Sequence, residues 1–257
     1  MCDMTTRHLY HKSKGVAVHT LWSHSCTRHY LGIQGCDEGY AEVEWAEGRK
    51  IEIRTPISWT EKQINRCYQF YSQFKTADDL ARYLIPKAKR IDVSKGKWYL
   101  MPDGKVPSGC EELFCSNNHL TELLLPSSCK RVGCSNNLLT EVVVPDGCVF
   151  LDCSHNPLLE LFLPKGCKRI ICTGTKIQEL IVPEGCLDVT CFACSLIKLV
   201  VPEGCLSIGC SNNFLTELKV PKSCIRLVCH KNFFTELTVP KKCEVITNDV
   251  VKIINYE

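Results

Sequence analysis

The sequence predicts a solenoid, in which short coils of chain stack on one another, and three series of residues support this prediction. Two series of cysteines and one of prolines each recur every 19 residues. A fixed period of about this length is typical of repeat architectures, in which each coil packs only against its neighbours. The first series is Cys115, Cys134, Cys153, Cys172, Cys191, Cys210 and Cys229. The second is Cys110, Cys129, Cys148, Cys167, Cys186, Cys205, Cys224 and Cys243. The prolines are Pro107, Pro126, Pro145, Pro164, Pro183, Pro202, Pro221 and Pro240.

Each repeat contains the alternation of a short strand. In the stretch CEELFCS, Leu113 and Cys115 are predicted to face inward and the residues beside them outward. One coil alone leaves the apolar face of its strand uncovered. The strand of the next coil must therefore stack beside it, about 4.8 Å away.

An asparagine recurs at the turn after the strand, at Asn118, Asn137, Asn156, Asn213 and Asn232. Such side chains, buried at a turn, can bond the backbone of neighbouring coils. Thr175 and Cys194 take this position in two coils, so we expect the middle of the solenoid to be its least regular part. Nineteen residues leave no room for a helix on the outer side of a coil, and each proline favours extended backbone in the residue before it.

The repeat reads P-x-x-C-x-x-L-x-C-x-x-N-x-L-x-x-L-x-V and resembles the leucine-rich repeat, whose core is L-x-x-L-x-L-x-x-N-x-L. Cysteine takes two of the leucine positions. The resemblance covers about residues 107 to 250 and is closest to short, 19-residue repeats of bacterial and phage type. It implies an α/β fold class: a curved leucine-rich-repeat solenoid with a parallel sheet on its concave face.

Three regions are expected along the chain: a strand-rich region over 1–57, a helical cap over 58–90, and a solenoid of about eight coils over 91–257. The first two would form a small α+β capping region, since the exposed end of a solenoid core needs a cap. Ser58 and Glu61 form a capping box at the start of the first predicted helix. The four predicted strands of the first region are GVAVHTLW, RHYLGI, YAEVEW and RKIEIR, and the last two alternate as a hairpin does.

Residues 90–107 are interpreted as a degenerate first coil. Ile91 and Val93 would take the positions that Leu113 and Cys115 hold in the next coil, with about three residues inserted.

The 20 cysteines are interpreted mainly as core residues. The N-terminus has no continuous apolar segment of the kind a cleaved signal needs, so we expect a reducing compartment, where disulfide scaffolds are rare. Cysteine packs as a small, soft hydrophobe, which suits a narrow coil. Disulfides between adjacent coils remain an alternative, because stacked positions lie within the Cα separation that a disulfide tolerates. Four thiolates do not converge in this register, so no metal array is expected in the repeats.

Histidine and cysteine also gather in the N-terminal region, where the candidate zinc ligands are His24, Cys26, His29 and Cys36. Their spacing matches no established metal signature. There is no nucleotide-binding glycine loop, and for a Cys–His nucleophile pair no orienting Asp or Asn and no oxyanion element can be identified. We expect no cofactor and no enzyme activity in the repeats, and leave the N-terminal region open.

The register predicts the columns of the concave face. One column is Phe114, Gly133, Asp152, Ile171, Thr190, Gly209, Val228 and Thr247. Beside it runs Glu112, Arg131, Phe150, Arg169, Asp188, Ser207, Arg226 and Val245. The residues expected to bind a partner are Phe114, Arg131, Phe150, Asp152, Arg169, Ile171, Asp188, Phe192, Arg226 and His230. Interleaved aromatic and arginine side chains are typical of interface hot spots. The alternative is that Phe and Ile only pack on one another along the sheet.

These patterns favour a non-enzymatic protein-interaction module that binds a partner protein on the concave face. The resemblance to bacterial repeats implies an effector or inhibitor of a host factor. The alternative is nucleic-acid binding or a metal-dependent activity in the basic, His- and Cys-containing N-terminal region. Oligomeric state is left open.

On the convex side we expect a solvated acidic column that repels nucleic acid. It comprises Glu122, Glu141, Glu160, Glu179, Glu217 and Glu236, interrupted by Lys198. No apolar run is long enough to span a membrane, and the net charge of +3 is ordinary. A cytoplasmic location is therefore expected, and a protein delivered into a host cell by a signal-less route would have the same composition.

Overall fold

The chain divides into two compact units, residues 1–93 with 97–113, and residues 94–96 with 114–257. Among the residues that the structure describes, no helix is both long and apolar enough to cross a membrane. The computed structural model describes residues 5–10, 17–23, 27–31, 40–45, 51–54, 73, 79, 82–83, 85–249 and 251–256.

Five antiparallel strands form a sheet in the first unit, in the order β3-β2-β1-β4-β5. They are β1 (Thr5–Tyr10), β2 (Ala17–Ser23), β3 (Thr27–Leu31), β4 (Tyr40–Trp45) and β5 (Ile51–Arg54). The four predicted strands are present, and β4 and β5 form the predicted hairpin. The sequence pattern does not predict β1, yet this strand lies in the centre and pairs with both β2 and β4. Its segment TTRHLY lacks the period-two alternation of apolar residues that identifies a strand.

The predicted helical cap lies mostly outside the described residues. Within it the structure describes a turn at Gln73, helical conformation at Asp79, Arg82 and Tyr83, and the 3-10 helix η1 (Ile85–Lys87). Two further 3-10 helices follow, η2 (Trp98–Leu100) and η3 (Pro102–Gly104).

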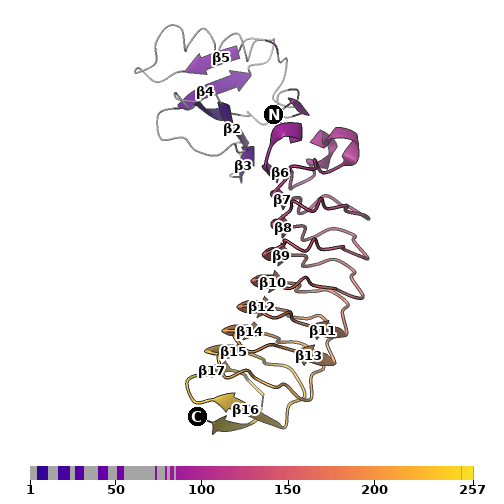
Figure 1. The fold of residues 1–257 in the computed structure, drawn as a ribbon, viewed down its shortest axis with the longest axis vertical. Coiled ribbons are helices and arrows are strands. Elements are labelled where there is room, and N and C mark those ends of the chain that lie inside the picture. The colour runs from indigo at the N-terminus through magenta and orange to yellow at the C-terminus, as the bar shows by residue number, and fades with distance from the viewer. Residues whose placement is uncertain are drawn as a thin grey trace. The chain divides into compact units, whose positions relative to one another are not determined.

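The repeats build a nine-stranded parallel sheet to which each coil contributes one strand of three residues (Figure 1). Its order is β17-β15-β14-β12-β10-β9-β8-β7-β6. The strands are β6 (Arg90–Asp92), β7 (Glu112–Phe114), β8 (Arg131–Gly133), β9 (Phe150–Asp152), β10 (Arg169–Ile171), β12 (Asp188–Thr190), β14 (Ser207–Gly209), β15 (Arg226–Val228) and β17 (Glu244–Ile246). The predicted degenerate first coil is confirmed, because β6 neighbours β7 in this order and Ile91 and Val93 are buried.

The other side of the coils carries two small parallel sheets. One pairs β11 (Glu179–Ile181) with β13 (Lys198–Val200), and the other pairs β16 (Glu236–Pro240) with β18 (Lys252–Tyr256). Figure 1 shows β11 and β13 across the coils from the nine-stranded sheet. As expected for so short a coil, the described residues from 105 to 249 contain no helix.

A hydrogen-bonded turn explains the spacing P-x-x-C. In each coil the carbonyl oxygen of the proline accepts a hydrogen bond from the N–H of the cysteine three residues later, at 2.8 to 3.4 Å. Such a four-residue β-turn reverses the chain direction within a few residues. It carries the chain from the side of β11 and β13 back towards the nine-stranded sheet.

Both cysteine columns lie in the core between these two sides. Of the cysteines that the structure describes, all are free thiols, and all are buried except the half-buried Cys243. The Sγ–Sγ distance between Cys224 and Cys243 is 3.7 Å. Burial raises the pKa of the Cys134 thiol to about 12, because the thiolate loses its hydration there. The thiols whose pKa is raised in this way are neutral packing groups at neutral pH, whereas hydrogen bonds with Cys172 and with the backbone of Thr175 lower the pKa of Cys194 to about 7.

The asparagine column forms a ladder of buried hydrogen bonds, as Asn213 illustrates. Its Oδ1 accepts hydrogen bonds from the N–H groups of Cys194 and Leu196, both at 3.0 Å. Its Nδ2 donates to the carbonyl oxygens of Cys191 and Cys210, both at 2.8 Å. The amide thus satisfies backbone groups of two adjacent coils. Related bonds are made by Asn137, Asn156 and Asn232.

A second column, which the repeat consensus does not reveal, lies one residue before the asparagine ladder and forms the turn there. Its residues have φ between 52° and 69°, the left-handed region. They are Asn117, Asn136, His155, Gly174, Ala193, Asn212 and Lys231. Residues such as Ala193 and Lys231 adopt this conformation at a cost, so the contacts between coils must offset it.

The two irregular ladder positions differ in how well they replace the amide. Cys194 donates its thiol to the carbonyl oxygen of Cys172 at 3.0 Å, the same 22-residue step that Asn213 makes to Cys191. Thr175 is buried, but its Oγ1 has no hydrogen-bond partner. The predicted irregularity is therefore located at Thr175.

Thr175→Asn is expected to raise the free energy of unfolding by about 1 kcal/mol. The two side chains have similar volumes, and the amide would complete the ladder between Asn156 and Cys194. Urea unfolding followed by circular dichroism measures the change, with the exposed Thr140→Asn as control. A lower midpoint for Thr175→Asn than for the control would contradict the interpretation.

Candidate functional site

The outward side chains of the nine-stranded sheet form a surface that we call the sheet face. From β6 to β15 the middle side chain of each three-residue strand is buried, and the flanking positions face outward, occupied by glycine at Gly133 and Gly209. In-register pairing stacks Arg131, Phe150, Arg169, Asp188, Ser207 and Arg226 in one column. It stacks Gly133, Asp152, Ile171, Thr190, Gly209 and Val228 in the next. The predicted columns are confirmed over these coils.

The last coil departs from the prediction by one residue. Arg226 pairs with Glu244 rather than Val245, and Val228 pairs with Ile246 rather than Thr247. The strand β17 begins directly after Cys243, whereas in other coils one residue separates the cysteine from the strand. Because Val245 and Ile246 are both apolar, the sequence fits either register.

Several predicted partner-binding residues contact each other within the sheet face. The guanidinium carbon of Arg131 lies 4.7 Å from the centroid of the Phe150 ring, a cation–π contact. In the next pair of coils, Arg169 Nε lies 3.2 Å from Asp188 Oδ2. Exposed ion pairs of this kind add at most about 1 kcal/mol of stability. The cation–π contact and the ion pair hold the side chains of Arg131 and Arg169 along the sheet. This restraint reduces the conformational entropy that these side chains would lose on binding a partner.

Two aromatic rings lean over glycines of the next coil. A Cβ atom on Gly133 would lie 2.8 Å from the ring of Phe114, and one on Gly209 would lie 2.8 Å from the ring of Phe192. Only glycine leaves room for these rings. Phe114 and Phe192 are half-buried, each with its ring packed over a glycine of the next coil. Ile171 on β10 is also half-buried.

The remaining predicted residues are tied to local partners or simply exposed. Asp152 Oδ1 accepts a hydrogen bond from the N–H of Ser154 at 3.1 Å. His230 Nδ1 lies 3.1 Å from Ser211 Oγ, and these residues follow the ends of β15 and β14 by two positions. Arg226 is exposed on β15.

The predicted residues form a strip rather than a pocket. Phe114 on β7 and Arg226 on β15 are separated by six strand spacings, or roughly 29 Å at 4.8 Å each. No small molecule contacts all of them at once, whereas a protein surface can. The strip contains cations, carboxylates, aromatic rings and hydroxyls.

The candidate zinc ligands receive no test. His24, Cys26 and Cys36 lie outside the described residues, and His29 is described only as a backbone position in β3 opposite Leu21. In the described part of the chain, no three His, Cys, Asp or Glu residues form a group able to hold a metal ion. The proposed basic nucleic-acid surface of the N-terminal region also stays a prediction.

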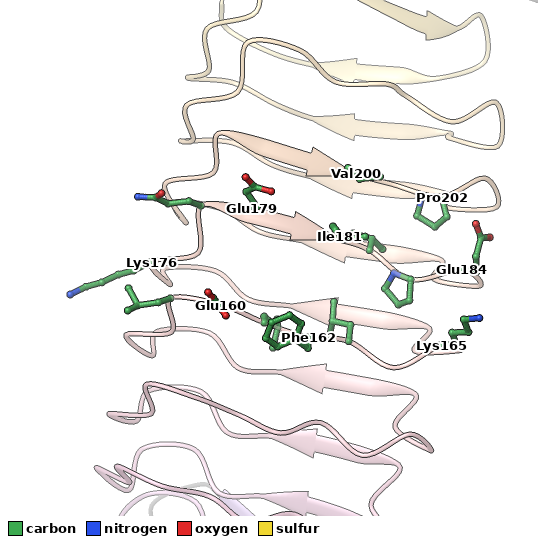
Figure 2. Close-up of a pocket in the computed structure, with 15 residues that line it drawn as sticks. Glu160, Phe162, Lys165, Lys176, Glu179, Ile181, Glu184, Val200 and Pro202 are labelled. Atoms are coloured by element: carbon green, nitrogen blue, oxygen red, sulfur yellow. The ribbon is translucent and has the colours of Figure 1, made fainter.

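The side opposite the sheet face carries a groove that the sequence reasoning missed. It has a volume of about 1010 Å³, and its floor includes Phe162, Ile181 and Val200 (Figure 2). A smaller hollow of about 420 Å³ continues it to Val143 and shares Phe162. The predicted acidic column is confirmed as exposed, but it runs beside this apolar surface.

The signal for the groove lies in runs such as TELLLP, TEVVVP and LELFLP. The exposed residues in them are Leu124, Val143 and Phe162, at 77%, 67% and 78% exposure. Their neighbours Leu123, Val142 and Leu161 are buried. Three apolar residues in a row carry no periodicity, so which one faces solvent cannot be read from the sequence.

A comparison of solved structures places the solenoid among known folds. The chain is similar to YopM from Yersinia enterocolitica WA-314, with 22% identity and a TM-score of 0.50, over 60% of this chain and 38% of that chain. The solenoid is a leucine-rich-repeat fold. At this identity the similarity shows the fold alone, and the leucine-rich-repeat solenoid described here spans well under half of YopM. No protein-family model and no curated protein matches the sequence.

Proposed function

We propose that this leucine-rich-repeat solenoid is a non-enzymatic interaction module that binds a partner protein along the sheet face. The observation that carries the proposal is the in-register strip in which Arg131 lies on Phe150 and Arg169 pairs with Asp188. Arginine and aromatic side chains held in place on a rigid sheet are the residues that most often dominate binding energy. Apart from the half-buried Cys243, the described thiols of the coils are buried in the core and do not form part of the sheet face.

The biological setting follows from analogy. The short cysteine-containing repeats resemble those of bacterial and phage proteins, and the solenoid shares its fold with YopM. We propose that the protein acts as an effector or inhibitor of a host factor, in the cytoplasm. The fold alone does not determine this role, so it rests on the binding experiment.

Phe150→Ala and Arg169→Ala are each expected to weaken partner binding about 5- to 30-fold, equivalent to about 1 to 2 kcal/mol. The intact tagged protein would capture partners from a host lysate after nuclease treatment. The partner identified by mass spectrometry would then be titrated against each variant.

Phe233→Ala and Lys241→Ala are the matched controls, since both residues are exposed outside the nine-stranded sheet. Equal affinity of all four variants for the partner would exclude the sheet face as the binding site. Capture that nuclease abolishes would favour nucleic-acid binding instead.

A further inference from the structure

The apolar column opposite the sheet face is not required by the fold. It comprises Leu124, Val143, Phe162, Ile181 and Val200, one residue from each of five successive coils. The next two coils have Lys219 and Thr238 in the same column, and both are exposed. Because these coils form with polar residues there, burial in the core does not explain the apolar residues in the other five.

The apolar side chains of this column are highly exposed to solvent. Phe162 is 78% exposed, Ile181 64% and Val200 44%. Figure 2 shows these three side chains following one another along the groove. Contiguous exposed apolar surface of this kind typically marks a site where another molecule binds.

A column of carboxylates runs parallel to the apolar one. Glu141 and Glu160 precede Val143 and Phe162 by two residues, so in extended backbone the two columns lie about 7 Å apart on the same face. Figure 2 shows Glu160 and Glu179 on one side of the apolar floor, with Lys165 and Glu184 at the other end. Glu179 is paired with Lys198 at 3.2 Å. Lys165, Lys176 and Glu184 line the edges of the groove, and Glu141 and Glu160 are the carboxylates directly beside Val143 and Phe162.

We propose that this groove binds an amphipathic helix of a partner protein, with an apolar stripe on the column and a basic stripe on Glu141 and Glu160. A helix running along the stack advances about 5.4 Å per turn, close to the roughly 4.8 Å between coils, so each turn can place one apolar side chain on one coil. Five coils span about 19 Å, the length of a helix of about 13 residues. The groove is a second surface, independent of the sheet face.

A synthetic 14-residue peptide with a leucine stripe beside a lysine stripe, labelled with fluorescein, tests this proposal by anisotropy. The intact protein is expected to bind it, and Phe162→Thr to weaken binding about tenfold or more. Threonine is chosen because Thr238 already occupies this column. Glu141→Gln combined with Glu160→Gln is expected to weaken binding about threefold at low salt and to flatten its salt dependence.

Phe150→Ala on the sheet face is the matched control and is expected to leave peptide binding unchanged. Three results would overturn the proposal: no binding of the peptide, equal binding of a version with glutamate for lysine, or equal binding by wild type and Phe162→Thr. Self-association of the wild-type protein that Phe162→Thr abolishes would show that a second copy covers the groove instead, and would also overturn it.

Discussion

Asn213→Thr is expected to lower the free energy of unfolding by about 3 to 5 kcal/mol. The substitution keeps the volume of the side chain but removes the amide that bonds Cys194, Leu196, Cys191 and Cys210. Each buried backbone group that loses its partner costs roughly 1 to 3 kcal/mol, and the threonine hydroxyl can recover only part of this. Urea unfolding at neutral pH, in reductant, measures the loss.

The exposed Asn248→Thr provides the control, since it makes the same chemical change without removing a buried amide. Asn213→Thr removes an amide from the ladder, Thr175→Asn adds one to it, and Asn248→Thr removes one from the surface. A loss below about 1 kcal/mol for Asn213→Thr would mean that water or neighbouring groups replace the amide, and that the ladder does not stabilise the stack.

Stability is expected to fall steeply above pH 9 because the buried thiols resist ionisation. Burial raises the pKa of Cys134 to about 12 and that of Cys229 to about 11, and raises the pKa of Cys153 and Cys191 well above the ordinary value of 9.0. Above pH 9 the unfolded chain releases these protons while the folded chain keeps them, which favours unfolding. The contribution is complete below pH 9 and is lost as pH rises towards the folded-state values.

Each such thiol lowers the free energy of unfolding by about 1.4 kcal/mol per pH unit in this window. Four of them would remove roughly 5 to 6 kcal/mol per unit, so the fold should be lost by about pH 11 even without denaturant. Urea midpoints at pH 8, 9, 9.5 and 10, in reductant, measure the slope. In Cys134→Ala the slope should be shallower by about 1.4 kcal/mol per pH unit, and an unchanged slope would show that this thiol is not the titrating group.

Regular features of the repeat could be predicted from the sequence because stacking copies them from coil to coil. The strand position, the inward Leu113 and Cys115, the asparagine ladder and the outward columns from Arg131 to Arg226 all follow from a 19-residue period. A column needs only the correct residue spacing, and the hydrogen bonds of a parallel sheet enforce that spacing.

Features that depend on backbone conformation could not be predicted in the same way. Ala193 and Lys231 have positive φ, although neither residue type favours it. The shift of β17 by one residue follows from a shorter turn after Cys243, where two neighbouring apolar residues fit either register. The central strand β1 could not be predicted because its segment TTRHLY has no alternation of apolar and polar residues.

By itself, the sequence determined that this chain is a solenoid of 19-residue coils, with cysteine and leucine columns inside and a mixed aromatic and arginine strip on its sheet. Because buried positions recur once per coil, the residue types that fill them recur with the same period, and this pattern can be recognised in the sequence alone. Only the tertiary structure decided that Arg131 rests on Phe150, that Phe114 and Phe192 cover glycines, and that Phe162 and Ile181 face solvent in a groove. Residues of neighbouring coils contact each other only if their side chains point towards one another, and the direction of a side chain depends on how the coils pack.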